Sequence, residues 1–230
     1  SFQLHKGEVL AITGLQGSGR DELADALFGV IPCKGKLSFG GQTLESAKSI
    51  QFHMSHGVAL VPRMRKERGI HDDLSILDNM SMAFLNTKWK KLLISGKAER
   101  ERFARQQKAL QIKAGNPADP ITSLSGGNQQ KVILGKWLET DAEVLLFDNP
   151  TQGIDVGTKF EIYHLILELA KQGKAIVVFS SEFPEIYKVA DSCMVLYKGR
   201  VNAVMGREEM TEKNVMYYST GANVEGAKNA

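Results

Sequence analysis

The chain has 230 residues, of which 43% are hydrophobic and 24% charged, so it can form one large domain or two small ones with a sizeable core. Its net charge of +3 is too small to indicate a nucleic acid or an anionic membrane as a partner. No apolar run approaches the ~20 residues that a membrane-spanning helix needs, and two cysteines, Cys33 and Cys193, are too few for a disulfide framework.

Residues 1–70 predict strands arranged around a glycine-rich loop. The apolar run at 8–13 is a strand candidate, and residues 21–29 have helical spacing that a glycine ends. The glycine pair at 40–41 predicts the turn of a hairpin, and 57–62 predicts a buried strand that a proline closes. This part therefore begins with a strand, a glycine loop and a helix.

Residues 71–125 have a different character, which indicates a helical subdomain. From 71 to 117, helix-like segments follow one another without a strong strand candidate, and a polar loop with two prolines ends the segment at 114–120. We interpret this part as an insertion between two parts of an α/β domain.

Residues 126–218 return to alternating strands and helices. Such alternation predicts a parallel sheet covered by helices on both faces, so the fold class is α/β. The helix predicted at 157–173 places Phe160 among the apolar residues that share one side. The polar residues at 219–230 are predicted to be a flexible tail. The predicted elements are a helix from 126, strands at 143–148 and 174–181, a helix at 182–190 and a hairpin at 192–205.

The stretch "GLQGSGRD" is the first candidate site. Its glycines let the backbone N–H groups surround an anion, and the helix that follows adds its positive end, which suits a phosphate. The alternative interpretation is a tight structural turn. Two positions differ from the usual phosphate-binding loop, which has lysine and then serine or threonine after its last glycine. The residues concerned are Gly14, Gly17, Ser18 and Gly19, with Arg20 and Asp21 at the two unusual positions.

The stretch "LSGGNQQK" is the second candidate site. A hydroxyl and unobstructed N–H groups at the start of a helix can bind a phosphate, although a capped helix without a ligand explains the same pattern. The glutamine side chains can reach back as capping partners. The candidate residues are Ser125, Gly126, Gly127, Asn128 and Gln129.

As a pattern, this second stretch resembles the signature loop of ATP-binding cassette (ABC) ATPases, and "GGNQQK" resembles the monosaccharide-importer branch. The resemblance covers about residues 1–218 and implies a P-loop NTPase core with an antiparallel β subdomain and a helical subdomain. It also implies binding of ATP and Mg²⁺. By position, it assigns Asp148 to the Walker B metal site together with Asp21, Asn149 to the water-activating place, Asp155 to the D-loop, Ser181 to the switch and Arg63 to the Q-loop.

The resemblance is closest to the second cassette of tandem sugar-importer ATPases. It implies the first cassette, transmembrane permease subunits and a periplasmic or lipid-anchored sugar-binding protein as partners, with no nucleic acid. It places the chain on the cytoplasmic face of the membrane as a peripheral subunit. Because the sequence starts abruptly before "HKGEVL", we expect a fragment of such a tandem protein.

Five positions depart from the hydrolytic pattern that the resemblance implies. Asparagine has no basic lone pair with which to take a proton from water, and loss of a catalytic base costs about 10²–10⁴-fold in rate. We expect that this chain's own Walker site is impaired and that its intact signature loop serves the ATP held by a partner cassette. An engineered or erroneous residue at position 149 would leave the other departures unexplained. The five are Arg20, Asp21, Arg63, Asn149 and Ser181.

Other functions stay open from the sequence. One is a cassette that holds ATP as a structural or regulatory element without hydrolysing it. Another is the ATPase half of a nucleoside importer, a branch in which the residue after the Walker B aspartate is often glutamine. A soluble ABC ATPase acting on ribosomes or DNA would require large charged insertions or coiled-coil arms, which the sequence lacks.

Overall fold

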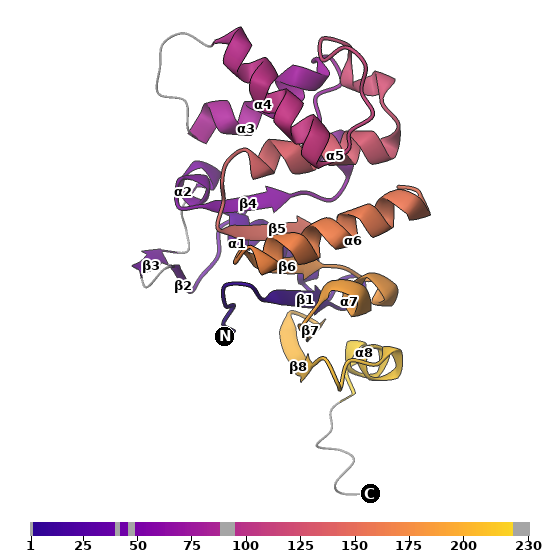
Figure 1. Cartoon of the computed structure of the whole chain (residues 1–230). Helices are drawn as coiled ribbons and strands as arrows, with labels where there is room; N and C mark the ends of the chain where they lie inside the picture. Colours follow the sequence, from indigo (N-terminus) through magenta and orange to yellow (C-terminus); the bar gives the residue numbers. More distant parts are fainter. Residues whose placement is uncertain (1, 40–41, 46–48, 88–94, 223–230) are drawn as a thin grey trace, which may run out of the picture.

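The central feature of the fold is a six-stranded sheet (Figure 1). The computed structural model describes residues 2–39, 42–45, 49–87 and 95–222. Across the sheet the strands are β4 (Val58–Val61), β5 (Val144–Asp148), β6 (Ala175–Phe179), β1 (Val9–Thr13), β7 (Ser192–Tyr197) and β8 (Arg200–Gly206). Neighbours pair in parallel, except that β8 is antiparallel to β7. The predicted parallel sheet is therefore confirmed.

A separate antiparallel pair lies near the N-terminus, as the sequence predicts. It consists of β2 (Lys36–Phe39) and β3 (Gln42–Glu45). The glycine pair predicted to form the turn lies outside the described residues.

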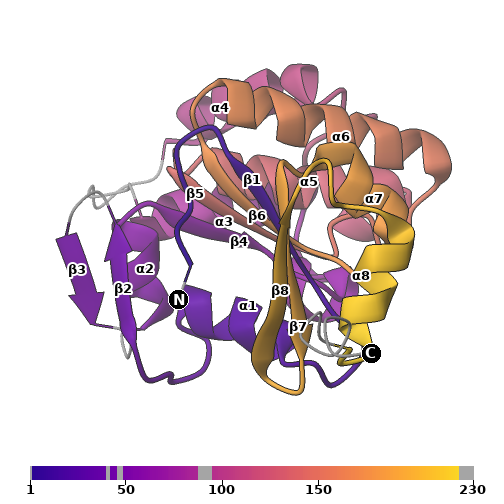
Figure 2. The same ribbon diagram turned by 90° about the horizontal axis from the view of Figure 1, so that it is seen from below.

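Helices cover both faces of the central sheet (Figure 2). Alternate side chains of a strand point to opposite faces. In β1, Leu10 and Ile12 pack with α1 (Arg20–Phe28), and α2 (Ile50–Ser55) follows on that face. Val9 and Ala11 belong to the cluster on the other face. The helices that contribute to this second cluster include α5 (Gly126–Leu138), α6 (Val156–Lys171), α7 (Phe183–Val189) and α8 (Glu212–Ser219).

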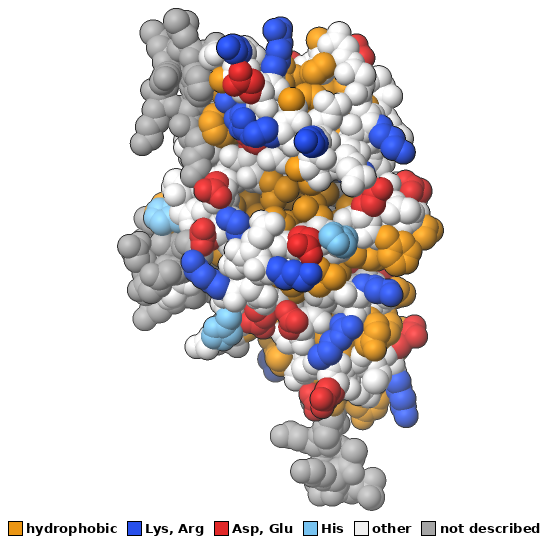
Figure 3. Space-filling view, viewed as in Figure 1, with side chains coloured by type: hydrophobic (Ala, Val, Ile, Leu, Met, Phe, Trp, Pro, Cys, Tyr) orange, Lys and Arg blue, Asp and Glu red, His pale blue; other side chains and the backbone are white. Residues whose placement is uncertain are grey.

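Between β4 and β5, the described residues form helices and loops with one isolated bridge from Ser75 to Pro120. The elements before α5 are η1 (Arg65–Gly69), α3 (Ile76–Thr87), α4 (Gly96–Ala109) and η2 (Ile121–Ser123). α3 approaches α5 closely at Gly135. A Cβ added there would lie 2.9 Å from Met80 Cε. An apolar hollow of about 870 Å³ separates this helical part from α6, and Figure 3 shows its hydrophobic side chains.

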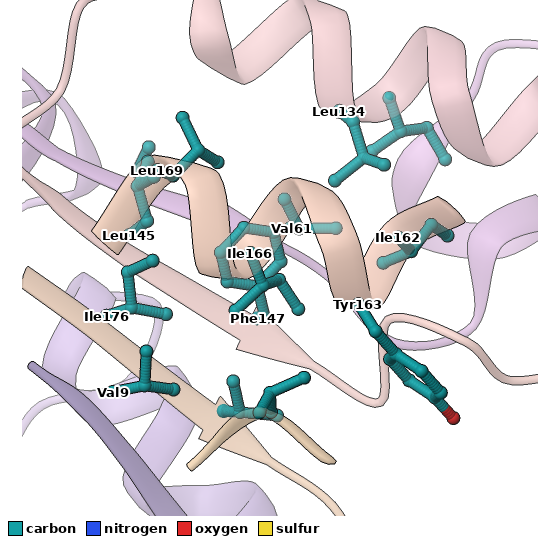
Figure 4. Packing of buried hydrophobic residues seen from close by; sticks show 14 of the residues in the cluster. Val9, Val61, Leu134, Leu145, Phe147, Ile162, Tyr163, Ile166, Leu169 and Ile176 are labelled. Atoms are coloured by element: carbon teal, nitrogen blue, oxygen red, sulfur yellow. The ribbon is translucent and has the colours of Figure 1, made fainter. Parts of the chain in front are cut away.

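One of the two hydrophobic core clusters lies between the sheet and α6 (Figure 4). Phe147 of β5 and Ile166 of α6 are both fully buried there. Burial of such a side chain contributes about 1.5–3 kcal/mol. The strand ends that hold the candidate site are therefore fixed by apolar packing on the face that α6 covers.

Two local predictions need correction. Phe160 is 54% exposed, because the buried face of α6 is centred on Ile162, Tyr163 and Ile166, which lie elsewhere around the helix. The predicted flexible tail begins at residue 219, whereas α8 includes Ser219, whose hydroxyl donates to Val215 O from a buried position.

Candidate functional site

The loop at residues 14–19 links the carboxyl end of β1 to α1, and glycine is required at several of its positions. A Cβ added at Gly14 would lie 2.5 Å from the backbone oxygen of Leu196. Gly17 and Gly19 have φ angles of 76° and 94°, in the left-handed region that favours glycine. The glycines therefore allow a tight approach to β7 and a left-handed path into the helix.

Two side chains, one in this loop and one at the first position of α1, have buried polar atoms without a hydrogen-bond partner among the described residues. Ser18 Oγ and Arg20 Nη1 find no hydrogen-bond partner within the described part of the chain. Buried polar atoms usually have a partner, so an unsatisfied pair indicates a place for a ligand. A hydroxyl and a guanidinium beside a helix N-terminus are suited to an anion such as phosphate.

A cavity of about 630 Å³ lies over this loop at the carboxyl ends of β1, β5 and β6. In parallel α/β sheets, ligands bind outside this edge. The structure brings most of the predicted Walker-site residues together in its lining. They are Gly14, Gly17, Ser18, Gly19, Arg20, Asp21, Arg63, Asn149 and Ser181.

α8 also lines the cavity, which the sequence did not predict. It contributes Glu212, Val215, Met216 and Ser219. No motif marks this helix, and it lies almost 200 residues from the glycine loop along the chain. Only the position of α8 beside β7 and β8 in the fold identifies these residues.

A cluster of ion pairs lies at the floor of this cavity. Arg63 Nη1 donates to Asp148 Oδ2 at 2.5 Å, and Arg63 Nη2 donates to Asp25 Oδ2 at 2.9 Å. Arg68 Nη2 donates to the other oxygen of Asp25 at 2.6 Å. Asp148 ends β5 and is 0% exposed. The predicted Q-loop residue is thus bonded to the predicted Walker B aspartate.

The guanidinium of Arg63 stays protonated between these two carboxylates. Burial alone would lower the pKa of its guanidinium, but hydrogen bonds and attraction from Asp148 and Asp25 outweigh burial and raise that pKa. Arg63 and Arg68 belong to a run of basic residues at 63–68. Both side chains are largely buried in ion pairs because β4 directs the loop toward α1.

The predicted metal ligands do not fit a divalent cation in this arrangement. Both oxygens of Asp148 already accept hydrogen bonds, one from Arg63 and one from Asn149 Nδ2 at 3.0 Å. Asp21 Oδ1 accepts from both Nε and Nη2 of Arg20. Among the described residues, no group of three His, Cys, Asp or Glu side chains gathers as a metal site. The assignment of Asp148 and Asp21 to Mg²⁺ stays a prediction that these contacts do not favour.

Asn149 and Ser181 are the predicted catalytic-position residues. Asn149 has a φ of 46°, and its backbone N–H donates to Phe179 O at 2.8 Å, which ties the end of β5 to β6. Its amide donates to Asp148, so the side chain faces a carboxylate and supplies no base. Ser181 lines the same cavity after β6. A hydroxyl there cannot serve as the cationic donor that a histidine can become.

The second candidate site lies at the N-terminus of α5, apart from this cavity. Ser125 is the exposed N-cap residue, and its Oγ accepts from Asn128 Nδ2 at 2.9 Å. The expectation that glutamines cap the helix is wrong for Gln129, whose side chain accepts from Arg65 Nε and donates to Ile121 O. The Gln129 side chain therefore links the start of α5 to η1 and η2.

The start of α5 packs on the start of α6. A Cβ added at Gly127 would lie 2.6 Å from Thr158 Oγ1 and 3.2 Å from Asp155 Oδ2. Asp155 caps α6 by accepting from the N–H and Oγ1 of Thr158, and these bonds lower its pKa. The predicted signature and D-loop residues are thus neighbours. None of them is among the described residues that line the cavity over the glycine loop.

A parallel sheet with a strand, a glycine loop and a helix at its edge, and an aspartate ending a neighbouring strand, defines a nucleotide-binding α/β protein of the P-loop class. A family model described as "ABC transporter" matches residues 1–152. The chain belongs to the ABC transporter family.

Curated relatives match nearly the whole chain. It is 40% identical over 223 residues to "Ribose import ATP-binding protein RbsA" of Oceanobacillus iheyensis, covering 96% of this chain and 45% of that protein. It is 43% identical over 223 residues to "Xylose import ATP-binding protein XylG" of Moorella thermoacetica, covering 96% and 44%. The chain thus spans less than half the length of these relatives.

A solved structure confirms the fold. The dimeric post-hydrolysis state of the ATP-binding cassette MJ0796, bound to ADP and Pi, is similar with a TM-score of 0.78 and 20% identity, over 90% of this chain and 88% of that one. In the described ranges of the present chain, no helix combines the length and apolar character that crossing a membrane requires.

Proposed function

We propose that this chain is one ATP-binding half of a sugar importer, with a non-hydrolytic Walker site of its own. In this account its signature loop completes the active site of a partner cassette. The names of the ribose and xylose import relatives support the substrate class, and their greater length supports a second cassette in the same polypeptide. The sugar-binding protein, the membrane permease and a place on the cytoplasmic face of the membrane follow from the same relationship.

The observation that carries the proposal is that both carboxylate oxygens of Asp148 already accept hydrogen bonds. Its carboxylate is buried under Arg63 and Asn149, and the next residue along the chain has an amide in place of a carboxylate. The carboxylate of Asp148 is therefore not accessible to a metal ion, and position 149 supplies no base to orient water. It keeps the glycine loop, Ser18 and Arg20, which are groups that bind phosphate.

The signature loop offers a different set of groups. The first N–H groups of α5 have no partner within the helix, and the exposed hydroxyl of Ser125 lies beside them. We assign these donors to the terminal phosphate of the ATP that the partner cassette holds. The metal ion bound with that ATP would neutralise charge on the transferred phosphoryl group. The residues of this chain contribute positioning and hydrogen bonds to the developing charge.

The test is phosphate release by the purified chain with ATP and Mg²⁺. We expect turnover far below about 1 s⁻¹, the lower end of ordinary enzymes. Asn149→Ala serves as the matched control and should leave this residual rate within about twofold, since no base is removed. Turnover above that level, abolished by Asn149→Ala, would contradict the proposed division of labour.

A further inference from the structure

Arg63 lies where the resemblance places a metal ion, against the aspartate that ends β5. Its Nη1 contacts Asp148 Oδ2 at 2.5 Å, and the Asp148 side chain is 0% exposed. Asn149 Nδ2 occupies the other oxygen at 3.0 Å. A guanidinium is always charged at physiological pH, so Asp148 has a permanent cation beside it.

The position of Arg63 is held from two sides of the cavity floor. Its other terminal nitrogen is bonded to Asp25 of α1 at 2.9 Å, and its side chain is only 17% exposed. Asp25 in turn is held by Arg68 at 2.6 Å. If Arg63 left to admit a metal, its ion pairs with both Asp148 and Asp25 would break, and a metal bound at Asp148 would not replace the pair with Asp25.

The positive and negative charges of this cluster balance without a further cation. Three guanidinium groups, on Arg20, Arg63 and Arg68, face three carboxylates, on Asp21, Asp25 and Asp148. Mg²⁺ requires several oxygen ligands in near-octahedral geometry, whereas both oxygens of Asp148 and of Asp25 and one oxygen of Asp21 are engaged by nitrogen donors. The cluster is therefore neutral before any metal binds.

Arg63 also faces the ligand space. It lines the cavity together with the glycine loop, where Ser18 Oγ and Arg20 Nη1 are buried without partners in the described chain. Guanidinium groups bind phosphate oxygens well without a metal. These donors converge on the place where a polyphosphate would lie.

We infer that Arg63 takes the place of the divalent cation at this Walker site, which therefore binds a nucleoside triphosphate as the metal-free anion. The inference rests on the proposed nucleotide binding at this loop and adds the form of the ligand. It makes this site differ from the partner's, where ATP binds together with a metal. The site would stay loaded when divalent cations are scarce.

The test is calorimetric titration of the full chain with ATP, once with Mg²⁺ and once with EDTA. For the unaltered chain we expect dissociation constants within about threefold of each other, since the phosphates meet arginine in both cases. In Arg63→Gln, binding in EDTA should weaken by at least about tenfold and should recover when Mg²⁺ is added. Lys66→Gln removes a positive charge from an exposed position in the same loop and should keep the metal independence.

Each outcome of these titrations supports or overturns the inference. If EDTA weakens binding to the unaltered chain more than about tenfold, a metal is required and the inference fails, while the proposed lack of turnover is untouched. Absence of ATP binding in both buffers also overturns it. If Arg63→Gln does not fold, the comparison of the two buffers with the unaltered chain still gives the answer. Rapid phosphate release, measured separately, would instead overturn the proposed function.

Discussion

Asn149 and Arg63 both contact the carboxylate of Asp148, so the proposed impairment of this site does not reside in one residue. The asparagine amide and the arginine guanidinium each donate to a separate oxygen of that carboxylate. A base restored at position 149 would lie next to an aspartate whose metal-binding oxygens are occupied. Changing one of the two residues therefore leaves the other obstacle in place.

We predict that Asn149→Glu alone does not restore hydrolysis. The new carboxylate would lose the amide hydrogen bond and add a like charge beside Asp148, which disfavours ionisation of both. Phosphate release by the isolated chain should rise less than about tenfold. A rise of about 10²–10⁴-fold, the usual value of a general base, would show that position 149 is the sole defect.

For individual residues, the sequence predicts which ones lie at the site. It does not predict which side chains they contact there. Arg20, Asn149 and Ser181 line the cavity because each lies just after a glycine loop or the end of a strand. Asp25 and Arg68 were missed because nothing in their local sequence signals an ion pair. Their contact depends on the packing of α1 against the segment after β4.

The contact between the starts of α5 and α6 shows why the predicted signature loop has glycine at position 127. The Cβ position of Gly127 lies 2.6 Å from Thr158 Oγ1, which is too close for ordinary contact. Any side chain at 127 must therefore displace the first turn of α6 and the capping Asp155. Close packing of two helix ends positions the donors of the loop.

Gly127→Ala should lower the free energy of unfolding by about 1–3 kcal/mol, the usual cost of overpacking. In a Thr158→Ala background the same substitution should cost clearly less, because both crowding atoms of Thr158 are gone. Urea unfolding of the four proteins of this double-mutant cycle gives the coupling. Additive effects of the two substitutions would show that the contact is not responsible.

α5 also carries a buried lysine whose ionisation should be visible in stability. Lys136 Nζ donates to Gly69 O of η1, and burial lowers the pKa of its ammonium group to about 8 from 10.5. Between these two values the unfolded chain binds more protons than the folded chain. Stability should therefore rise with pH across this window and be penalised below it.

We predict that the free energy of unfolding of the unaltered chain increases by up to about 3 kcal/mol, relative to that of Lys136→Met, as the pH rises from about 8 to 10.5. The methionine keeps an apolar stem of similar length but does not titrate. The measurement is the difference in unfolding free energy between the two proteins at several pH values, so that contributions from other groups cancel. A flat difference would show that Lys136 has an ordinary pKa in the folded chain.

The sequence predicted helices and strands where local signals were strong. The glycine loop before α1 and the small-residue start of α5 appear as expected, because each needs a backbone that glycine permits. The role of α8 as a wall of the cavity was not predictable. It depends on the antiparallel β7–β8 pair, which leads the chain back to the site.

The molecule as a whole has two separate phosphate-binding candidates. One is the cavity over the glycine loop, where the charge cluster lies, and the other is the N-terminus of α5 beside Asp155. Because the second lies outside the first cavity, one copy of the chain does not bring both to the same ligand. In the proposed account, a partner cassette holds the ligand of the second candidate.

The most direct measurement is the ATPase rate of the full transporter, reconstituted with its membrane subunits and carrying either Ser125→Ala or Asn149→Ala in this half. Ser125→Ala is preferable to a substitution at Gly127, whose side chain would also disturb α6. Loss of the exposed Ser125 hydroxyl should lower the rate by about 10²–10³-fold, the cost of one donor to developing charge. Asn149→Ala should change it by less than about threefold. Equal losses, or a larger loss at Asn149, would contradict the account.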